Sequence, residues 1–267
     1  MSTRDTADAG ARAAGALDQA AARRLLQLWD DQQSAYVAHR DLRFEAMFDV
    51  LRLHCPDDLT ILDLACGPGA ISDRVLAGLP QAAAVAVDYD PMLLTVAQGA
   101  LDRYGSRAEV RDVDLTTEDW EKALAGRRID AVLSSTALHW LSPAQLLRVY
   151  TAAARLLPAG GVLLNADHLR YDGSAPTLSD IARRHDERVQ EETFAAGALS
   201  YSAWYAEAAR HPELAGLAAE RERRFADRPP QALASLEFHL AALRTAGFAE
   251  VGTVWQYLDD YVVFARR

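Results

Sequence analysis

Two glycines follow an acidic residue in the segment Asp63–Gly69, directly after a short apolar run. Glycines at such a turn let the backbone approach a ligand closely, and the helix that follows offers unpaired N–H groups. Similar turns receive the pyrophosphate of dinucleotides, but the third glycine position of that motif is Ser72 here. A carboxylate at Asp63 would repel a pyrophosphate and suits a ligand with an ammonium group. The segment therefore predicts a site for a small ligand with a cationic end, and it disfavours a nicotinamide oxidoreductase.

Acidic residues also follow the next two apolar runs. In doubly wound folds, an acid at the position of Asp88 accepts hydrogen bonds from a ribose diol. Asp90 precedes a proline and fits the N-cap of the next helix instead. Asp112 closes the third run, where an adenine would lie, and Asp114 competes with it for that contact. For either of these two acids, a solvated loop position is an equally good interpretation.

Short apolar runs that alternate with amphipathic segments must position these residues. Continuous apolar strands separated by helices predict a parallel sheet that is covered on both faces. The strands are expected at residues 59–64, 82–87, 108–113, 129–134 and 162–165, with a terminal pair at 251–257 and 261–265. Helices are expected within residues 17–54, from 70 through 79, and at 90–104, 117–125, 142–157 and about 233–246.

These motifs resemble those of the class I methyltransferases that use S-adenosylmethionine (SAM). Asp63–Gly69 looks like the first motif of that family, Asp88 like its ribose acid and Asp112 like its adenine contact. The segment 157–164 is similar to the family's turn into strand five. The resemblance covers roughly residues 55–166 and 230–267. It implies an α/β fold with a Rossmann-like, seven-stranded, mostly parallel sheet of order 3-2-1-4-5-7-6, strand 7 antiparallel, and SAM at the carboxyl ends of the strands.

The same resemblance implies where the cofactor binds and which groups handle protons. Tyr36 is expected to lie against the sulfonium through cation–π attraction. His139 and His168 are the candidate general bases, because the reference pKa of histidine lies near neutrality. A histidine that only stabilises its loop is the alternative for His139. We expect no metal. The expected cofactor-binding residues are Asp63, Ala65, Gly67, Gly69, Asp88, Tyr89, Asp112, Val113, Thr136 and Tyr36.

The chain is expected to form one domain with two helical additions. Residues 1–16 read as a disordered tail, and 17–267 as a SAM-binding α/β domain with an N-terminal helical cover at 17–55. Residues 167–229 form a polar helical insertion, which we expect to act as a cap over the acceptor. Its aromatic residues Tyr201, Trp204 and Tyr205 have helical spacing, which favours core packing over a pocket wall. His185, His211 and His239 are expected at the surface.

Composition restricts the partners. The formal charge of −10 argues against nucleic acid as a partner, because binding to phosphates depends on clustered Lys and Arg. The two cysteines give neither a disulfide framework nor a usual zinc spacing. No leader or membrane-spanning run is apparent, so a cytoplasmic location without membrane contact is expected. The partner should be a small-molecule acceptor, and a homodimer is an open alternative.

These observations favour an enzyme that methylates a small acceptor at O, N or C with SAM. Binding motifs do not say which carbon next to the sulfonium is attacked. An attack on the aminobutyryl arm, such as cyclisation to azetidine-2-carboxylate with release of methylthioadenosine, is therefore one alternative. A non-catalytic SAM-binding regulatory subunit is another.

Overall fold

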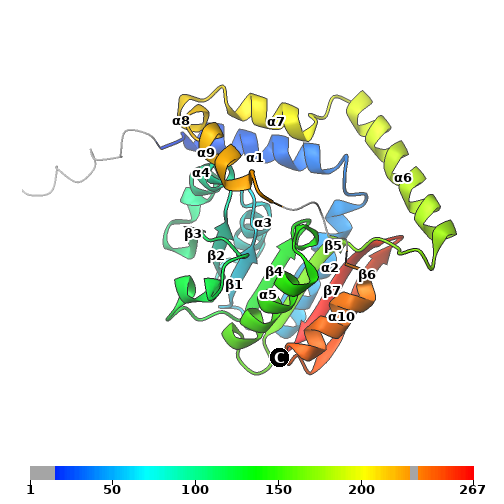
Figure 1. Cartoon of the computed structure of the whole chain (residues 1–267). Coiled ribbons are helices and arrows are strands. Elements are labelled where there is room, and N and C mark those ends of the chain that lie inside the picture. Colours follow the sequence, from blue (N-terminus) through cyan, green and yellow to red (C-terminus); the bar gives the residue numbers. More distant parts are fainter. Residues whose placement is uncertain (1–15, 229–233) are drawn as a thin grey trace, which may run out of the picture.

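The computed structural model describes residues 16–228 and 234–267, and it contains a seven-stranded sheet of order β3-β2-β1-β4-β5-β7-β6 (Figure 1). The first five strands run parallel, and β7 is antiparallel to both β5 and β6. This confirms the strand order expected from the sequence. The strands are β1 (Thr60–Leu64), β2 (Ala83–Asp88), β3 (Ala108–Asp112), β4 (Ala131–Ser135), β5 (Val162–His168), β6 (Glu250–Tyr257) and β7 (Asp260–Arg266).

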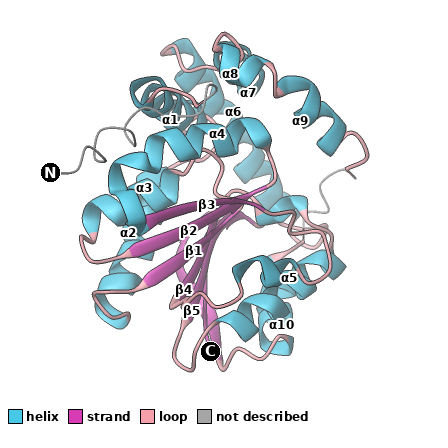
Figure 2. Ribbon diagram, turned by 90° about the vertical axis from the view of Figure 1, so that its left-hand side faces the viewer, coloured by secondary structure: helices cyan, strands magenta, loops and turns pink. Residues whose placement is uncertain are grey.

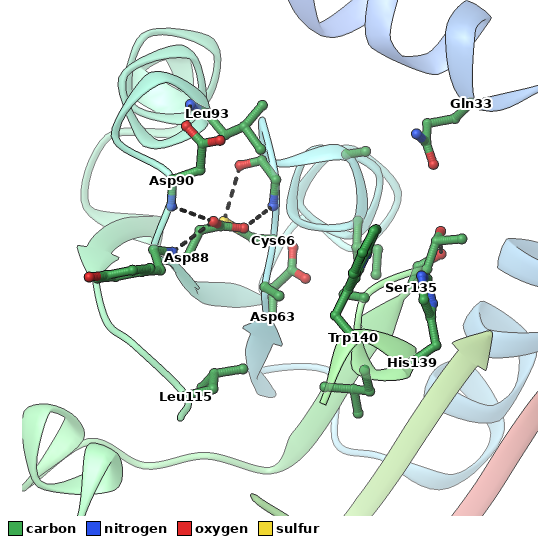
Figure 3. A pocket seen from close by; sticks show the side chains of 18 of the residues that line it. Gln33, Asp63, Cys66, Asp88, Asp90, Leu93, Leu115, Ser135, His139 and Trp140 are labelled. Carbon is green, nitrogen blue, oxygen red and sulfur yellow. Dashed lines mark hydrogen bonds between the residues drawn. The ribbon is translucent and has the colours of Figure 1, made fainter. Parts of the chain in front are cut away.

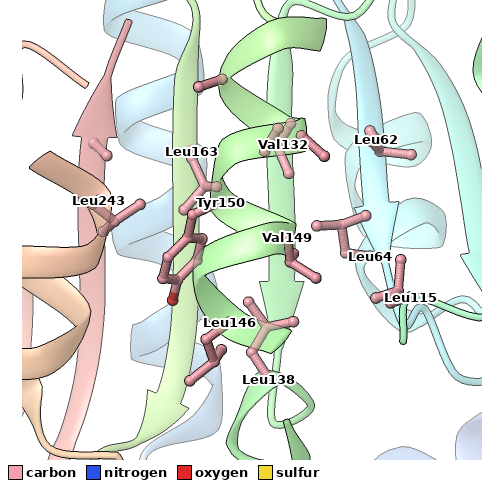
Figure 4. Close-up of a cluster of buried hydrophobic side chains, with 14 of the residues drawn as sticks. Leu62, Leu64, Leu115, Val132, Leu138, Leu146, Val149, Tyr150, Leu163 and Leu243 are labelled. Carbon is pink, nitrogen blue, oxygen red and sulfur yellow. The ribbon is translucent and has the colours of Figure 1, made fainter. Parts of the chain in front are cut away.

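Helices cover both faces of the sheet (Figure 2). On one face α5 and α10 pack against each other and against the strands, around the fully buried Tyr150 and Leu243 (Figure 4). On the other face α2 and α3 pack against the sheet, and α4 packs against β3. The α-helices are α1 (Gln19–Gln33), α2 (Arg40–His54), α3 (Ala70–Gly78), α4 (Pro91–Leu101), α5 (Pro143–Leu156), α6 (Pro176–Ala195), α7 (Tyr201–Ala208), α8 (Pro212–Ala215), α9 (Ala218–Phe225) and α10 (Leu236–Thr245).

Side-chain caps begin two of these helices, and the one at Asp90 was predicted. Asp90 accepts hydrogen bonds from the backbone N–H groups of Met92 and Leu93 at the start of α4. Ser142 forms a capping box with Gln145 at the start of α5. Each cap satisfies N–H groups that have no partner within the helix, and thereby fixes where the helix begins.

Three segments differ from the sequence-based expectation. The helical segment expected within 17–54 consists of α1 and α2, and the sequence did not locate the bend between them, in which His39 has a φ of 54°. The helix expected at 117–125 is only a 3-10 turn, Trp120–Leu124. β5 continues to His168, so the first two residues assigned to the cap insertion belong to the sheet. The tail predicted for residues 1–16 lies outside the described residues except for Ala16, as does Leu233 of the last helix.

The N-terminal helix and the inserted helices meet above one end of the sheet (Figures 1 and 2). α1 packs against α4 and α7. Trp204 of α7 is fully buried there, and its indole N–H donates to the carbonyl oxygen of Leu25 in α1 at 2.9 Å. Trp204 is thus a core residue, as its spacing predicted. It joins the N-terminal helical cover to the cap insertion, two segments that are far apart in the sequence.

Candidate functional site

A cavity of 490 Å³ lies between the carboxyl ends of the parallel strands and the cap helices (Figure 3). Its volume is typical of small-molecule sites. The predicted site residues that line it are Tyr36, Asp63, Ala65, Gly67, Asp88, Tyr89, Val113, Thr136, His139 and His168. Gly69 and Asp112, which were also predicted, are not among the lining residues.

Asp63 lies in β1 and lines the cavity, and its side chain is fully buried. Its Oδ2 accepts hydrogen bonds from the hydroxyl of Ser72 at 2.8 Å and from the Ser72 N–H at 3.1 Å. Its Oδ1 has no hydrogen-bond partner in the part of the chain that the structure describes. Burial raises the pKa of Asp63 from 3.8 to about 7, although the bonds from Ser72 oppose that shift. A carboxylate left half-satisfied beside a cavity would be stabilised by a cationic ligand.

Asp88 organises the turn that contains the two glycines (Figure 3). Its Oδ2 accepts from the Gly67 N–H at 2.8 Å, while Oδ1 accepts from the N–H groups of Tyr89 and Asp90. Burial raises its pKa, and these N–H groups counteract the rise. A carboxylate has about four lone-pair sites, so Asp88 keeps capacity to accept a hydroxyl group.

The two glycines of the turn have different surroundings. Gly67 has a φ of +57°, and a Cβ there would lie 3.8 Å from the Trp29 ring, another lining residue. Gly69 has a φ of +94°, and a Cβ there would lie 3.1 Å from the Leu101 side chain. Gly67 therefore keeps space at the cavity, whereas Gly69 keeps space for the packing of α3 on α4.

Two lining residues other than glycine also have left-handed backbone conformations. Ala65 has a φ of 52° and Thr136 a φ of 55°. Such conformations cost free energy in residues with a Cβ and are found disproportionately at functional sites. Both lie just after a parallel strand, β1 and β4 respectively, where the chain turns across the cavity.

The structure separates the two candidate adenine acids. Asp112 is about half exposed, and Arg224 of α9 lies against both of its carboxylate oxygens. Asp114 lines the cavity, with Arg228 at 3.7 Å. The alternative acid therefore lines the cavity, and the first choice does not.

α9 presents a row of arginines to the acids at this edge. Arg221 donates from Nε to the Asp90 carboxylate at 2.6 Å, and the Tyr205 hydroxyl donates to the same oxygen at 2.8 Å. Arg224 also donates to the carbonyl oxygen of Tyr89 at 2.9 Å. None of the residues of α9 is buried, so ion pairs hold this helix in place more than apolar packing does.

His139 forms a buried pair with Asp167. The two side chains approach to 2.6 Å through His139 Nδ1, and the Asp167 carboxylate also accepts the N–H groups of both His139 and His168. Burial would raise the pKa of Asp167, but the two histidines and Arg43 lower it to about 2. Asp167 is therefore ionised, and it orients the ring of His139 within the cavity wall.

His168 lies against a second carboxylate, in a close contact that lacks the hydrogen-bond geometry of the His139 pair. Its Nδ1 contacts Asp260 Oδ1, and the fully buried Arg43 donates to the same oxygen at 3.0 Å. The ring centroids of His139 and His168 lie 6.1 Å apart. His168 lines the cavity, whereas Asp167 does not. Residues alternate along β5, so Asp167 points behind the wall and supports it instead.

The N-terminal helical cover and the cap insertion contribute aromatic and polar groups to the cavity. Tyr36, in the bend after α1, was predicted to lie here and lines the cavity, as does Trp29 of α1. Tyr201 lines it as well, with its ring centroid 5.9 Å from Trp29, although core packing was the favoured expectation for this residue. Sequence reasoning did not find the lining residues Arg40, Phe44, Arg170, Gln190, Phe225 and Arg228, which no local motif marks.

One histidine contradicts its predicted place. His239 was expected at the surface, but it is fully buried and bonded to the Tyr150 hydroxyl at 2.6 Å. Burial lowers its pKa to about 4. Within residues 16–228 and 234–267, no group of three or more His, Cys, Asp and Glu side chains is arranged to hold a metal ion. Nor does that part of the chain contain a helix long and apolar enough to cross a membrane.

Comparison with known proteins identifies the domain. Residues 61–161 match the family model described as a methyltransferase domain. The chain carries a class I SAM-dependent methyltransferase domain. Its relatives include a trans-aconitate 2-methyltransferase from Azoarcus sp. (strain BH72), which is 32% identical over 145 residues, 54% of this chain and 52% of that protein. The chain thus spans about half the length of this curated relative.

Two further comparisons agree with this assignment. A malonyl-[acyl-carrier protein] O-methyltransferase from Bacillus cytotoxicus is 29% identical over 108 residues, 40% of this chain and 34% of that protein. A crystal structure of an O-methyltransferase family protein from Burkholderia thailandensis has a TM-score of 0.52 and 19% identity. It covers 93% of this chain and 72% of its own, and at this identity it shows the fold of the methyltransferase domain.

The residues of the methyltransferase domain fit SAM, the cofactor that the family indicates. The unpaired Oδ1 of Asp63 supplies negative charge for a ligand with ammonium and sulfonium groups. Asp88 keeps capacity for a ribose hydroxyl, and Gly67 leaves room for the ligand at the turn. The acidic groups Asp63, Asp88 and Asp114 all lie at the β1 to β3 end of the cavity, while the two histidines lie at the β4 to β5 end.

Proposed function

We propose that this chain catalyses SAM-dependent methylation of an oxygen atom on a small-molecule acceptor. The pair of His139 and Asp167 in the cavity wall carries this proposal, because its donor–acceptor distance of 2.6 Å suits a histidine that must accept a proton. When bound, SAM supplies a methyl group that is already activated by the positive sulfur. The protein must then align the acceptor, exclude water and remove a proton.

His139 acts as the general base in this proposal. Nδ1 faces Asp167, so Nε2 on the opposite edge of the ring is free to receive the acceptor's proton. The ionised Asp167 holds the ring and stabilises the imidazolium that forms, as the aspartate does in other His–Asp pairs. An oxygen acceptor is favoured over carbon because a hydroxyl group gains most from a base of this strength.

The cofactor residues of the proposal follow the cavity lining. They are Asp63, Ala65, Gly67, Asp88, Tyr89, Val113, Thr136 and Tyr36, with Asp114 in the place first given to Asp112. Gly69 acts indirectly by allowing the turn to form. The cap helices restrict access to the cavity, which supports a small acceptor and the exclusion of water from the reaction.

The names of the relatives offer the first acceptors to assay. The Azoarcus relative is named for trans-aconitate, and the Bacillus relative for a malonyl group on a carrier protein. Both compounds should be assayed as candidate acceptors, together with uncharged hydroxyl compounds.

The deciding experiment combines product analysis with one substitution. The protein is incubated with SAM, alone and with each acceptor, and the nucleoside products are identified by mass spectrometry. We expect S-adenosylhomocysteine only when an acceptor is present. The variant His139→Gln should lower kcat by about 10²- to 10⁴-fold and leave S-adenosylhomocysteine binding unchanged, whereas His211→Gln, outside the cavity, should match the parent protein.

Two results would contradict this function. Methylthioadenosine formed from SAM alone would show attack on the aminobutyryl arm. Full activity of His139→Gln would remove the base from the mechanism and leave only the binding site.

A further inference from the structure

The acceptor end of the cavity contains two imidazoles, each with Nδ1 beside a carboxylate; only His139 makes a hydrogen bond to it. His139 Nδ1 faces Asp167, and His168 Nδ1 faces Asp260. Both rings line the cavity, and each is about nine-tenths buried. Their centroids are 6.1 Å apart, so one small molecule can contact both rings.

The orientation of the rings fixes what they offer to a ligand. A carboxylate beside Nδ1 favours the tautomer that carries its proton on Nδ1. In a neutral imidazole with that tautomer, Nε2 has a lone pair and accepts a hydrogen bond. The wall therefore presents two acceptors to the ligand, and the matching ligand has two donors. A carboxylate has no proton to donate and does not match.

The charges around the two rings lead to the same conclusion. Arg43 is bound to Asp260, and Arg170 is bound to both Asp186 and Asp259. With Asp167, four carboxylates thus surround two guanidinium groups next to the histidines. Further along the wall, Arg40 and Arg74 share Asp30. Among these described residues carboxylates outnumber arginines, so the net charge of the set disfavours an anionic acceptor.

A flat surface lies beside the two imidazoles. Trp140 lines the cavity with its ring centroid 5.4 Å from that of His139. The indole is half exposed, which is unusual for so large an apolar side chain, and a ligand could cover it. Aromatic rings pack well against such a surface.

We propose that the acceptor is an uncharged aromatic molecule with two neighbouring hydroxyl groups, one bonded to His139 and the other to His168. This proposal rests on the proposed function and names its substrate class. The hydroxyl oxygen at His139 forms the new bond to the methyl carbon and gives its proton to His139 Nε2. The bond between that carbon and sulfur breaks and leaves its electron pair on sulfur, so the second product is S-adenosylhomocysteine. His168 accepts a hydrogen bond from the second hydroxyl group and thereby selects the substrate.

The test measures binding to the protein loaded with S-adenosylhomocysteine, by isothermal titration calorimetry. The probes are 4-methylcatechol, 4-methylphenol with a single hydroxyl, and trans-aconitate. We expect 4-methylcatechol to bind at least tenfold more tightly than 4-methylphenol, and trans-aconitate to show no binding. The variant His168→Leu should reduce the preference for the diol to less than threefold, while His211→Leu should preserve it.

The same probes are then assayed for methyl transfer, so that the two proposals can fail separately. The substrate class is overturned if trans-aconitate binds or is methylated, if 4-methylcatechol binds no better than 4-methylphenol, or if none of the probes binds. Methylation of trans-aconitate would still support the proposed function. Binding of 4-methylcatechol with the expected preference, but without S-adenosylhomocysteine formation from SAM, would uphold the diol site and contradict methyl transfer.

A merely structural role for His168 is also distinguishable. Loss of structure in His168→Leu would weaken binding of all ligands, including S-adenosylhomocysteine. The proposal requires that this variant binds S-adenosylhomocysteine and 4-methylphenol as the parent protein does. A uniform loss of affinity overturns the assignment of His168, and His168→Gln, which retains a hydrogen-bond acceptor, should recover part of the preference for the diol.

Discussion

Arg224 Nη1 lies between the two carboxylate oxygens of Asp112, at 2.9 and 2.7 Å, and so ties α9 to the end of β3. The contact is made next to Tyr89 and Asp114, both of which line the cavity. α9 is therefore fixed by charge at the β1 to β3 end of the cavity. Salt should weaken this attachment, because screening acts most strongly on partly exposed ion pairs.

The variant Arg224→Gln is expected to release S-adenosylhomocysteine faster than the parent protein. Partly exposed ion pairs contribute about 0.2–1 kcal/mol, so the dissociation rate should rise up to about fivefold. Stopped-flow measurement at low and high salt checks this, and the difference between the proteins should shrink as salt increases. Arg223→Gln is the matched control, because Arg223 is mostly exposed and pairs with Glu220 on its own helix. Equal rates in both variants would argue against the attachment.

Asp63 is expected to make the stability of the free protein depend on pH. Its pKa is raised from 3.8 to about 7 in the folded state, chiefly by burial. The folded protein therefore retains a proton that the unfolded chain has lost, and the stabilisation is complete below about pH 4 and lost as pH rises through 7. The shift corresponds to a difference on the order of 4 kcal/mol. Asp63→Asn should match the parent protein near pH 4 and be more stable at pH 8, in urea unfolding measurements.

The same carboxyl group should control cofactor affinity. Ionised Asp63 attracts the ammonium group of S-adenosylhomocysteine, so the affinity of the parent protein for this ligand should fall roughly tenfold per pH unit below about 7. Asp63→Asn should bind weakly at all pH values from 5 to 8. A variant that kept both the affinity and its pH dependence would exclude Asp63 from the site.

The acids after β2 and β3 are expected to differ in importance. Asp88→Asn removes a charge and one acceptor from the turn at Gly67, and should weaken S-adenosylhomocysteine binding at least tenfold. Asp112→Asn should affect affinity only through α9, by less than about fivefold. Calorimetric titration compares the two variants. A larger loss of affinity in Asp112→Asn than in Asp88→Asn would favour Asp112 over Asp114 as the adenine contact.

Alanine at the two turn glycines should separate stability from binding. Gly69→Ala combines a left-handed φ with a contact to Leu101 at 3.1 Å, so it should destabilise the protein by more than the roughly 1–2 kcal/mol that the φ alone costs. Gly67→Ala carries the same φ cost but meets only an ordinary contact with Trp29, and its Cβ takes space at the cavity. The thermal unfolding temperature should be lower for Gly69→Ala, and the affinity for S-adenosylhomocysteine should be lower for Gly67→Ala. The reverse order would contradict these roles.

The sheet could be predicted from the sequence because its strands are continuous apolar runs with clear turns between them. Gly67, Asp88 and Asp90 belong to local motifs, and each lies at the end of a strand or the start of a helix, where a motif fixes the position. The strand order itself came from the resemblance, since periodicity alone does not order parallel strands.

The partners of these residues were not predictable in the same way. Asp260 reaches His168 only because β7 inserts next to β5, and their positions differ by 92 in the sequence. The contacts of Arg224 and Arg221 likewise depend on how α9 lies against the sheet edge. His239 was misplaced because a polar residue on a helix suggests exposure, whereas Tyr150 gives it a buried partner.

The hydrogen bond from Trp204 to Leu25 has a consequence for evolution and for protein engineering. α1 and the inserted helices together cover the site, but all the parallel strands lie between them in the sequence. A change in acceptor preference can arise in either piece, but an exchange of one piece alone would leave Trp204 against a foreign partner. Transplanting the selectivity of this site onto a related scaffold should therefore require residues 19–40 and 169–228 to move together.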